Sequence, residues 1–260
     1  MISKDSKDFI GSIERCMKVI RAFDADDVEM SPADVAVKTG LTRATARRIL
    51  LTLTTLGYVA SDGKWFRLSP KILDLGFSYL TSMQIGQVIQ PIINATSKKV
   101  GETCVLSVLQ EDDIVSIAHS SFDRFDQVTF YPGTHLPACA SAAGRVILAY
   151  QKPEKLDTYF KKVKLKRFTP TTITNKANFR KELEKISRQG YARVDGELEI
   201  GLYTIAAPIF NDEKKPIAAV SFGGNVARIN DGNIEKQYLP ELFSVAQSIG
   251  KLLPDKHSIF

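Results

Sequence analysis

The segment GLTRATARRILLTLTTLGYVASDGKWFRL, residues 40–68, decides the fold of the first part of the chain. Its first half repeats apolar residues at the spacing of a helix that buries one face. The members of this stripe are Ala46, Ile49, Leu50, Leu53 and Leu56. Its second half places Asp62-Gly63 between two short apolar runs, which is a strong signal of a β-hairpin. We therefore predict a helix followed directly by a hairpin.

The residues before this segment add the signals of further helices. Ser31 and Pro32 predict the start of a short helix that ends at Gly40, and Thr42 is the expected N-cap of the long helix. Apolar residues at helical spacing predict another helix at residues 13–23. Three helices followed by a hairpin predict a winged helix-turn-helix domain.

The outer face of the long helix indicates what this domain binds. Arginines and small residues lie away from the apolar stripe, and in helix-turn-helix proteins this face enters the major groove of DNA. The predicted contacts to double-stranded operator DNA are Thr42, Arg43, Ala44, Thr45, Arg47, Arg48, Lys64 and Arg67. An ordinary solvated helix face is one alternative, and a winged helix that binds RNA or protein is another.

The distribution of charge agrees with the DNA-binding interpretation. The net charge of +6 is by itself a weak indication of nucleic-acid binding. Residues 1–30 hold 5 basic and 7 acidic residues, whereas residues 31–68 hold 6 basic and 2 acidic residues. Positive charge is therefore concentrated in the segment that is predicted to contact DNA.

Cysteine usage and hydropathy favour a cytoplasmic protein. The three cysteines are far apart and form no CxxC pair, which argues against a disulfide framework and against a zinc finger. The N-terminus has no apolar signal core, and the uncharged run at residues 75–97 is too polar to span a membrane. We therefore expect a cytoplasmic location and no membrane partner.

The rest of the chain predicts a connector and a second domain. An apolar helix is expected to begin after Ser69, and we interpret residues 70–86 as a connector helix between domains 1–69 and 87–260. Strands are expected at residues 104–110, 114–119, 126–131, 191–195, 203–210 and 216–222, with helices near residue 141, at 178–188 and from 233. Hairpin-linked strands mixed with helices predict an antiparallel α+β domain.

Long segments of the sequence resemble one known family, the IclR-type bacterial transcription regulators. GTHLPACASAAGRVILAY, residues 133–150, is similar to the family's effector loop and helix, and residues 167–224 are similar to its C-terminal signature. The segments TRATARR, SPKILDLGFSYLTSM and GELEIGL are most similar to the protocatechuate and 4-hydroxybenzoate regulators of the β-ketoadipate pathway. The resemblance covers nearly the whole length of the chain.

The resemblance implies a fold, an assembly and a function. The C-terminal domain would be a GAF-like antiparallel sheet with flanking helices that binds a small carboxylate effector. The protein would form a homodimer through the DNA-binding part and, as many members do, a dimer of dimers. It would activate genes of aromatic-acid catabolism, with a repressor of another carbon-catabolic operon as the alternative.

The family's effector contacts carry over to matching positions of this chain. These positions are Val128, Leu136, Ala142, Ala143, Asp195, Leu202, Thr204, Ser221 and Gly223. Thr204 stands where relatives often carry cysteine or serine, and Gly223 stands where some carry serine. These two departures leave the identity of the ligand open.

Physical chemistry supports the same site independently. Ser141 opens a helix after a proline-containing loop, and the start of a helix favours an anion such as a carboxylate. Ser141 therefore joins the predicted effector site. Arg124, Arg145 and Arg193 are candidate counter-charges, with surface or ion-pair roles as the alternative.

An enzyme is a further alternative for the second domain. Cys139 or Ser141 could act as a nucleophile beside a histidine, but neither residue lies in a GxSxG elbow and no orienting carboxylate is apparent. A buried structural Cys139 is the simpler interpretation, although His119 with Cys139 stays open as a metal-binding pair. The carboxylates of Asp195, Glu197 and Glu199 fit surface charge or a ligand contact. We predict no catalytic residue, no metal site and no cofactor.

Overall fold

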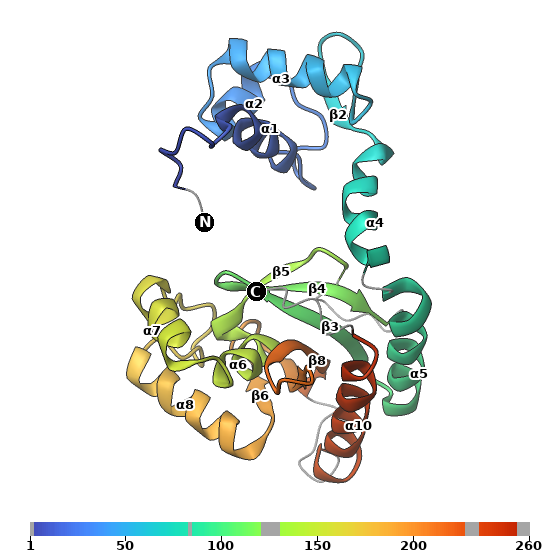
Figure 1. Ribbon diagram of the computed structural model, residues 1–260, viewed down its shortest axis with the longest axis vertical. Helices are drawn as coiled ribbons and strands as arrows, with labels where there is room; N and C mark the ends of the chain where they lie inside the picture. Colours follow the sequence, from blue (N-terminus) through green and yellow to red (C-terminus); the bar gives the residue numbers. More distant parts are fainter. Residues whose placement is uncertain (1–2, 83–84, 121–130, 227–233, 254–260) are drawn as a thin grey trace. The chain divides into compact units, whose positions relative to one another are not determined.

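The computed structural model of the chain describes residues 3–82, 85–120, 131–226 and 234–253. The chain divides into two compact units, residues 1–79 and residues 80–260 (Figure 1). Each unit has its own buried core, so each is described by itself.

The N-terminal unit contains three helices and a hairpin, as predicted for a winged helix-turn-helix. Its elements are α1 (Gly11–Arg21), α2 (Pro32–Thr39), α3 (Arg43–Thr55), β1 (Val59–Ser61) and β2 (Phe66–Leu68). The Ser31 side chain caps α2 by accepting a hydrogen bond from the Asp34 amide. Thr42 Oγ1 caps α3 in the same way, at 3.2 Å from the Thr45 amide. Both helix starts agree with the sequence prediction.

The apolar stripe of α3 forms part of the core of this unit. Ala46, Leu50 and Leu53 are buried against residues from α1, α2 and the hairpin, and Ile49 is half-buried beside them. Leu56 is different: the predicted stripe included it, but its side chain is 52% exposed. Leu56 is the C-cap residue that follows the helix end at Thr55, and its amide still donates to the Thr52 carbonyl oxygen at 2.9 Å.

The wing has a longer turn than the Asp-Gly signal predicts. β1 and β2 pair from Val59 with Leu68 to Ser61 with Phe66, which leaves four residues, 62–65, in the turn. The Asp62 carboxylate accepts hydrogen bonds from the amides of Lys64 and Trp65, at 2.9 and 2.8 Å. The Asp62 amide also donates to the Trp65 carbonyl oxygen at 3.3 Å, so the backbone and the Asp62 side chain together close the turn.

Four helical segments follow the hairpin. They are η1 (Pro70–Ile72), α4 (Leu73–Ser82), η2 (Ile85–Ile89) and α5 (Gln90–Val100). The apolar side chains of α4 are unusually exposed, since Leu73 is 70% and Phe77 65% exposed.

The C-terminal unit is built on one six-stranded antiparallel sheet, which confirms the predicted α+β fold. Its strands are β3 (Thr103–Gln110), β4 (Asp113–His119), β5 (His135–Pro137), β6 (Ala192–Asp195), β7 (Leu202–Phe210) and β8 (Pro216–Asn225). Their order in the sheet is β5-β4-β3-β8-β7-β6. β3 therefore pairs with β8, which comes about a hundred residues later in the chain.

Helices cover both faces of this sheet (Figure 1). The remaining elements are η3 (Ala138–Ala140), α6 (Ala142–Ala149), α7 (Pro153–Lys162), α8 (Lys176–Gln189), η5 (Ile234–Tyr238) and α10 (Leu239–Gly250). One core lies between the sheet and α5 with α10, and a second lies between the opposite face and α6 with α8. Residues 142–148 of α6 are all buried, so this short helix is an interior element.

One strand, one α-helix and the short helical segment η3 were not predicted. β5 lies within the loop expected at residues 132–140, and three residues give too short a pattern to recognise. α7 begins at Pro153, a residue that favours a helix start, but the preceding Lys152 provides no side-chain cap. Most of the strand expected at residues 126–131 lies outside the described residues.

Gly144 permits a close approach between α6 and η3. A Cβ atom at this position would lie 2.3 Å from both the Cα and the carbonyl oxygen of Ala138. Any side chain here would push the start of α6 away from the preceding loop. This glycine therefore fixes the position of the helix start on which the predicted effector site depends.

Candidate effector pocket and nucleic-acid interface

The start of α3 presents the predicted DNA contacts to solvent. Arg43, Ala44, Arg47 and Arg48 are exposed, and Thr45 is half-exposed. The Thr42 hydroxyl donates to Thr45 Oγ1 at 2.9 Å, which orients both side chains at the first turn. The core stripe holds the opposite side of the helix, so this group of side chains forms one outward surface.

The two predicted wing contacts already have partners within the unit. Lys64 Nζ lies 5.4 Å from the centre of the Trp65 ring, a cation–π geometry. Arg67 Nη1 lies 2.8 Å from Glu29 Oε1, and both of these side chains are exposed. The Glu29 carboxylate offsets part of the positive charge that Arg67 would offer to a phosphate.

A groove between α1 and α3 adds residues that sequence reasoning missed. It is lined by Ser12, Arg15, Cys16, Thr45, Arg48, Ile49 and Thr52. The guanidinium groups of Arg15 and Arg48 are the two charges among these residues. Arg15 was overlooked because the helical pattern of α1 gave no reason to associate it with α3.

The C-terminal unit contains a cavity between the sheet and the start of α6. The space inside it that is wide enough for a water molecule is about 30 Å³, which is below the range of about 300–1,000 Å³ typical of small-molecule sites. A ligand the size of an aromatic acid therefore requires the lining side chains to move apart. The lining residues are Val105, Ser107, Ile114, Leu136, Ala140, Ser141, Ala142, Ala143, Val194, Leu198, Leu202, Thr204 and Ser221. None of these described residues has a charged side chain.

The cavity brings together seven of the ten predicted effector residues. These are Leu136, Ser141, Ala142, Ala143, Leu202, Thr204 and Ser221. Asp195 is not among the lining residues, because its exposed carboxylate pairs with Arg193 Nε at 2.8 Å. Gly223 lies on β8 opposite Thr204 but also outside the lining. Val128 lies outside the described residues.

Six lining residues were not predicted. They are Val105, Ser107, Ile114, Ala140, Val194 and Leu198. Val105, Ser107 and Ile114 come from β3 and β4, whose apolar and small residues give no sign of a ligand. The alternation of these strands was visible in the sequence, but the pairing of β3 with β8 was not.

The start of α6 forms one wall of the cavity. Ser141 Oγ accepts a hydrogen bond from the Gly144 amide at 3.0 Å and so caps the helix. The amides of Ala142 and Ala143 belong to the first turn, where backbone N–H groups have no acceptor within the helix. These amides and the helix dipole are positioned to bind an anion.

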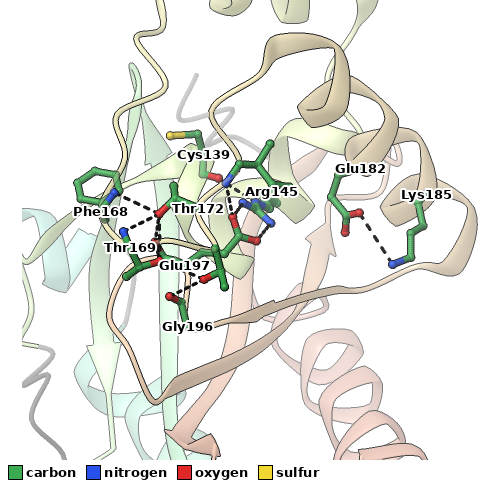
Figure 2. Close-up of polar contacts among 11 residues, drawn as sticks. Cys139, Arg145, Phe168, Thr169, Thr172, Glu182, Lys185, Gly196 and Glu197 are labelled. Atoms are coloured by element: carbon green, nitrogen blue, oxygen red, sulfur yellow. Dashed lines mark hydrogen bonds and ion pairs between the residues drawn. The ribbon is translucent and has the colours of Figure 1, made fainter.

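A buried ion pair holds this wall against the loop that follows β6. Arg145 donates from Nη1 and Nη2 to the two carboxylate oxygens of Glu197, at 2.7 and 2.6 Å (Figure 2). Its Nε donates to the Cys139 carbonyl oxygen at 2.8 Å. Arg145 is 1% exposed. All three donor positions of this arginine are therefore used inside the protein, so the ion-pair alternative holds for Arg145.

A threonine-rich segment completes the network around Glu197. Thr172 Oγ1 donates to the Glu197 carbonyl oxygen at 2.6 Å, and the Ile173 amide donates to Glu197 Oε2 at 2.9 Å (Figure 2). Because Leu198 lines the cavity, the network also positions one of the cavity's walls. Glu197 is thus a buried structural residue, and the surface role expected from its sequence was wrong.

The geometry gives little support to an enzyme. Burial raises the pKa of the Cys139 thiol, so the nucleophilic thiolate is disfavoured. Burial also lowers the pKa of His119, which favours the neutral imidazole. Across the described part of the chain, no three His, Cys, Asp or Glu side chains gather as metal ligands. No helix among the described residues is long and apolar enough to cross a membrane.

Two family models match consecutive parts of the chain. The IclR helix-turn-helix domain matches residues 12–63, and the C-terminal domain of the bacterial transcriptional regulator IclR matches residues 77–251. The two matches together cover both units described above.

Individual relatives match over most of the chain. The Pca operon regulatory protein of Acinetobacter baylyi is 32% identical, over 95% of this chain and 90% of the relative. The Pca regulon regulatory protein of Pseudomonas putida is 33% identical, over 93% and 84%. The p-hydroxybenzoate hydroxylase transcriptional activator of A. baylyi is 31% identical, over 95% and 93%.

Solved structures share the fold. A protein from Rhodococcus sp. RHA1, described as a transcriptional regulator, is 38% identical with a TM-score of 0.84, covering 94% of this chain and 98% of that one. The inducer-binding domain of the transcription factor PobR from Acinetobacter, solved as a double mutant with 3-hydroxybenzoic acid, is 29% identical with a TM-score of 0.60. It covers 64% of this chain and 98% of the PobR chain.

Proposed function

The chain belongs to the IclR family of bacterial transcriptional regulators, and on this premise we propose that its effector is an aromatic carboxylate. It is a DNA-binding regulator rather than an enzyme. The proposed effector is protocatechuate, 4-hydroxybenzoate or a related acid, and the proposed response is activation of genes for its catabolism. The names of three relatives and the 3-hydroxybenzoic acid bound to PobR support this class.

The cavity at the start of α6 carries the proposal. Its apolar lining from Leu136, Ile114 and Leu202 suits an aromatic ring, and the first-turn amides of α6 suit a carboxylate. Among the lining residues that the structure describes there is no cation, so these amides are the positive groups at this wall. Thr204 and Ser221 supply hydroxyl groups for further hydrogen bonds.

Calorimetric titration of the whole protein with protocatechuate and 4-hydroxybenzoate tests the proposal. Wild type should bind, and Ala143→Glu should not, because the new carboxylate adds bulk and like charge beside the anion site. Thr204→Val is the milder variant, since it removes one hydroxyl with little change in volume, and it should weaken binding. Operator binding by both variants should persist, because it belongs to the other unit. If Ala143→Glu is folded and binds as wild type does, the effector site lies elsewhere.

We further propose that residues 1–69 bind the operator and residues 87–260 bind the effector. Residues 70–86 would form the connector helix between these two domains. The base and phosphate contacts are assigned to Thr42, Arg43, Ala44, Thr45, Arg47, Arg48, Lys64 and Arg67. The exposure of the start of α3 supports this assignment, because the same helix is held from behind by its core stripe. A cytoplasmic location follows from this role.

We also propose a homodimer, with a dimer of dimers as a second level of assembly. Exposed apolar side chains on α4, at Leu73, Leu75 and Phe77, support burial against a second copy. A dimer would present two α3 helices to two half-sites of an operator. Analytical ultracentrifugation at micromolar protein should give the dimer or tetramer mass. A monomer with full operator affinity would contradict this assembly.

A further inference from the structure

Two buried polar atoms on β4 have no hydrogen-bond partner. They are Ser116 Oγ and His119 Nδ1. A buried group left without a partner costs about 1–3 kcal/mol, so such groups are rare unless something else binds them. The other two such atoms lie elsewhere, the Tyr159 hydroxyl on α7 and the Tyr203 hydroxyl on the far face of β7.

The strand register places both side chains on the face of the sheet that lines the cavity. Ser116 lies directly opposite Ser107, and His119 lies directly opposite Val105. Both partners on β3 line the cavity. Side chains directly opposite each other share a face, with Cβ atoms about 4.5–5.5 Å apart. Ser107 lines the cavity, and Ser116 and His119 lie beside the lining residues on the same face of the sheet without lining the cavity themselves.

A β-bulge makes this arrangement possible. Residues three apart on a regular strand face opposite sides, so Ser116 and His119 would normally be separated by the sheet. The register between β3 and β4 shifts at Leu106/Ser107, which adds one residue on β4 and returns His119 to the face of Ser116. Bulges often occur beside functional sites, where they redirect a side chain.

The chemistry of the three side chains is that of a site for a neutral hydroxyl group. Two serine hydroxyls each donate and accept, and a neutral imidazole has one donor and one acceptor. The cavity is lined by residues of the sheet and by Ser141, Ala142 and Ala143 at the start of α6. A ligand with its carboxylate at α6 would point the distal part of its ring toward β3 and β4.

We propose that Ser107, Ser116 and His119 form a subsite that binds a ring hydroxyl, so that the regulator selects hydroxylated aromatic acids over unsubstituted ones. This inference rests on the proposed function, because it takes the cavity as the effector site. The inference goes beyond the proposed function by naming the residues that bind the hydroxyl group on the ring.

Matched ligands and conservative variants test the subsite. Calorimetry would compare benzoate, 4-hydroxybenzoate and protocatechuate on wild type, Ser116→Ala and His119→Phe, all as full-length protein. Wild type should prefer the better of the two hydroxylated acids to benzoate. Ser116→Ala should weaken binding of that acid by about three- to tenfold, the value of one neutral hydrogen bond, and leave benzoate unchanged. His119→Phe keeps an aromatic ring but removes both ring nitrogens. It should also weaken binding of the hydroxylated acid and leave benzoate binding unchanged.

Stability provides a second readout and a matched control. Ser116→Ala should leave the ligand-free protein as stable as wild type or more so, since it removes an unpaired buried hydroxyl. Ser120 is a buried serine next to the same strand, but its Oγ accepts from the Cys104 amide at 2.9 Å. Ser120→Ala should therefore lower the unfolding midpoint and leave the preference between ligands unchanged.

Three results would overturn the subsite. In the first, wild type binds benzoate as tightly as the hydroxylated acids. In the second, Ser116→Ala and His119→Phe weaken all three acids by the same factor, as a purely structural role would. In both cases the proposed effector class would remain supported, and only the proposed hydroxyl subsite would be contradicted. If wild type binds none of the acids, the proposed effector class falls and the subsite falls with it.

Discussion

In the N-terminal unit, the arginines at the start of α3 are exposed and free to contact a charged partner. In the C-terminal unit, Arg145 is 1% exposed and every donor position is used by Glu197 and the Cys139 carbonyl. Water screens the first group, so changing it should alter binding and leave folding almost untouched. The second group is shielded from water, so changing it should alter folding first.

The largest effect is expected from breaking the buried ion pair. Glu197→Gln leaves the Arg145 guanidinium buried without its counter-charge, which should lower the free energy of unfolding by about 3–5 kcal/mol. Denaturant unfolding of the full chain measures this loss. The transition of the C-terminal unit should move to lower denaturant, and that of the winged helix should not.

An exposed pair two residues away provides the control. Asp195→Asn breaks the Arg193–Asp195 pair at the end of β6 and should cost less than about 1 kcal/mol. The double variant Arg145→Met with Glu197→Leu removes both buried charges and should recover much of the loss. Equal losses for Glu197→Gln and Asp195→Asn would show that burial does not distinguish the two pairs.

The two regions also differ in how much of each could be predicted from the sequence. The helical spacing of Ala46, Leu50 and Leu53 fixed the inward face of α3, because the contacts of a helix surface repeat locally. The same pattern assigned Leu56 to the buried stripe, but its side chain is 52% exposed at the C-cap of the helix. The outward face of α3 could therefore be predicted from the sequence of the helix alone.

The full lining of the cavity could not be predicted in this way, because it is formed by residues that are far apart in the chain. Family resemblance supplied residues such as Ala143 and Thr204, but Ser107 and Ile114 join them only through the pairing of β3 with β4 and β8. The bulge opposite Ser116 has no sequence signal of its own. Arg145 also looked like a candidate counter-charge, since its partner Glu197 lies 52 residues away.

A smaller effect is expected on the exposed surface, at Arg47. Arg47→Ala should weaken binding to the native operator by about 1–3 kcal/mol if the guanidinium forms a bidentate contact to guanine. Binding to a random duplex should weaken less, and the unfolding midpoint should stay unchanged. Titration with both duplexes, together with footprinting, measures the difference. Unchanged affinity for the operator would remove α3 from the proposed interface.

The smallest effect is expected at Arg15, in the groove between α1 and α3. We expect this side chain to contact a backbone phosphate, because Arg15 and Arg48 both line the groove and Thr45, from the first turn of α3, lines it as well.

Arg15→Ala should therefore weaken operator and random duplex by the same small factor and reduce the slope of log affinity against log salt by about one. Arg21, exposed at the far end of α1 and outside the groove, is the matched control, and Arg21→Ala should leave the slope unchanged. Titrations at several salt concentrations separate the two arginines. Equal slopes for wild type and Arg15→Ala would mean that α1 does not contact the DNA backbone, and the interface would then be confined to α3 and the wing.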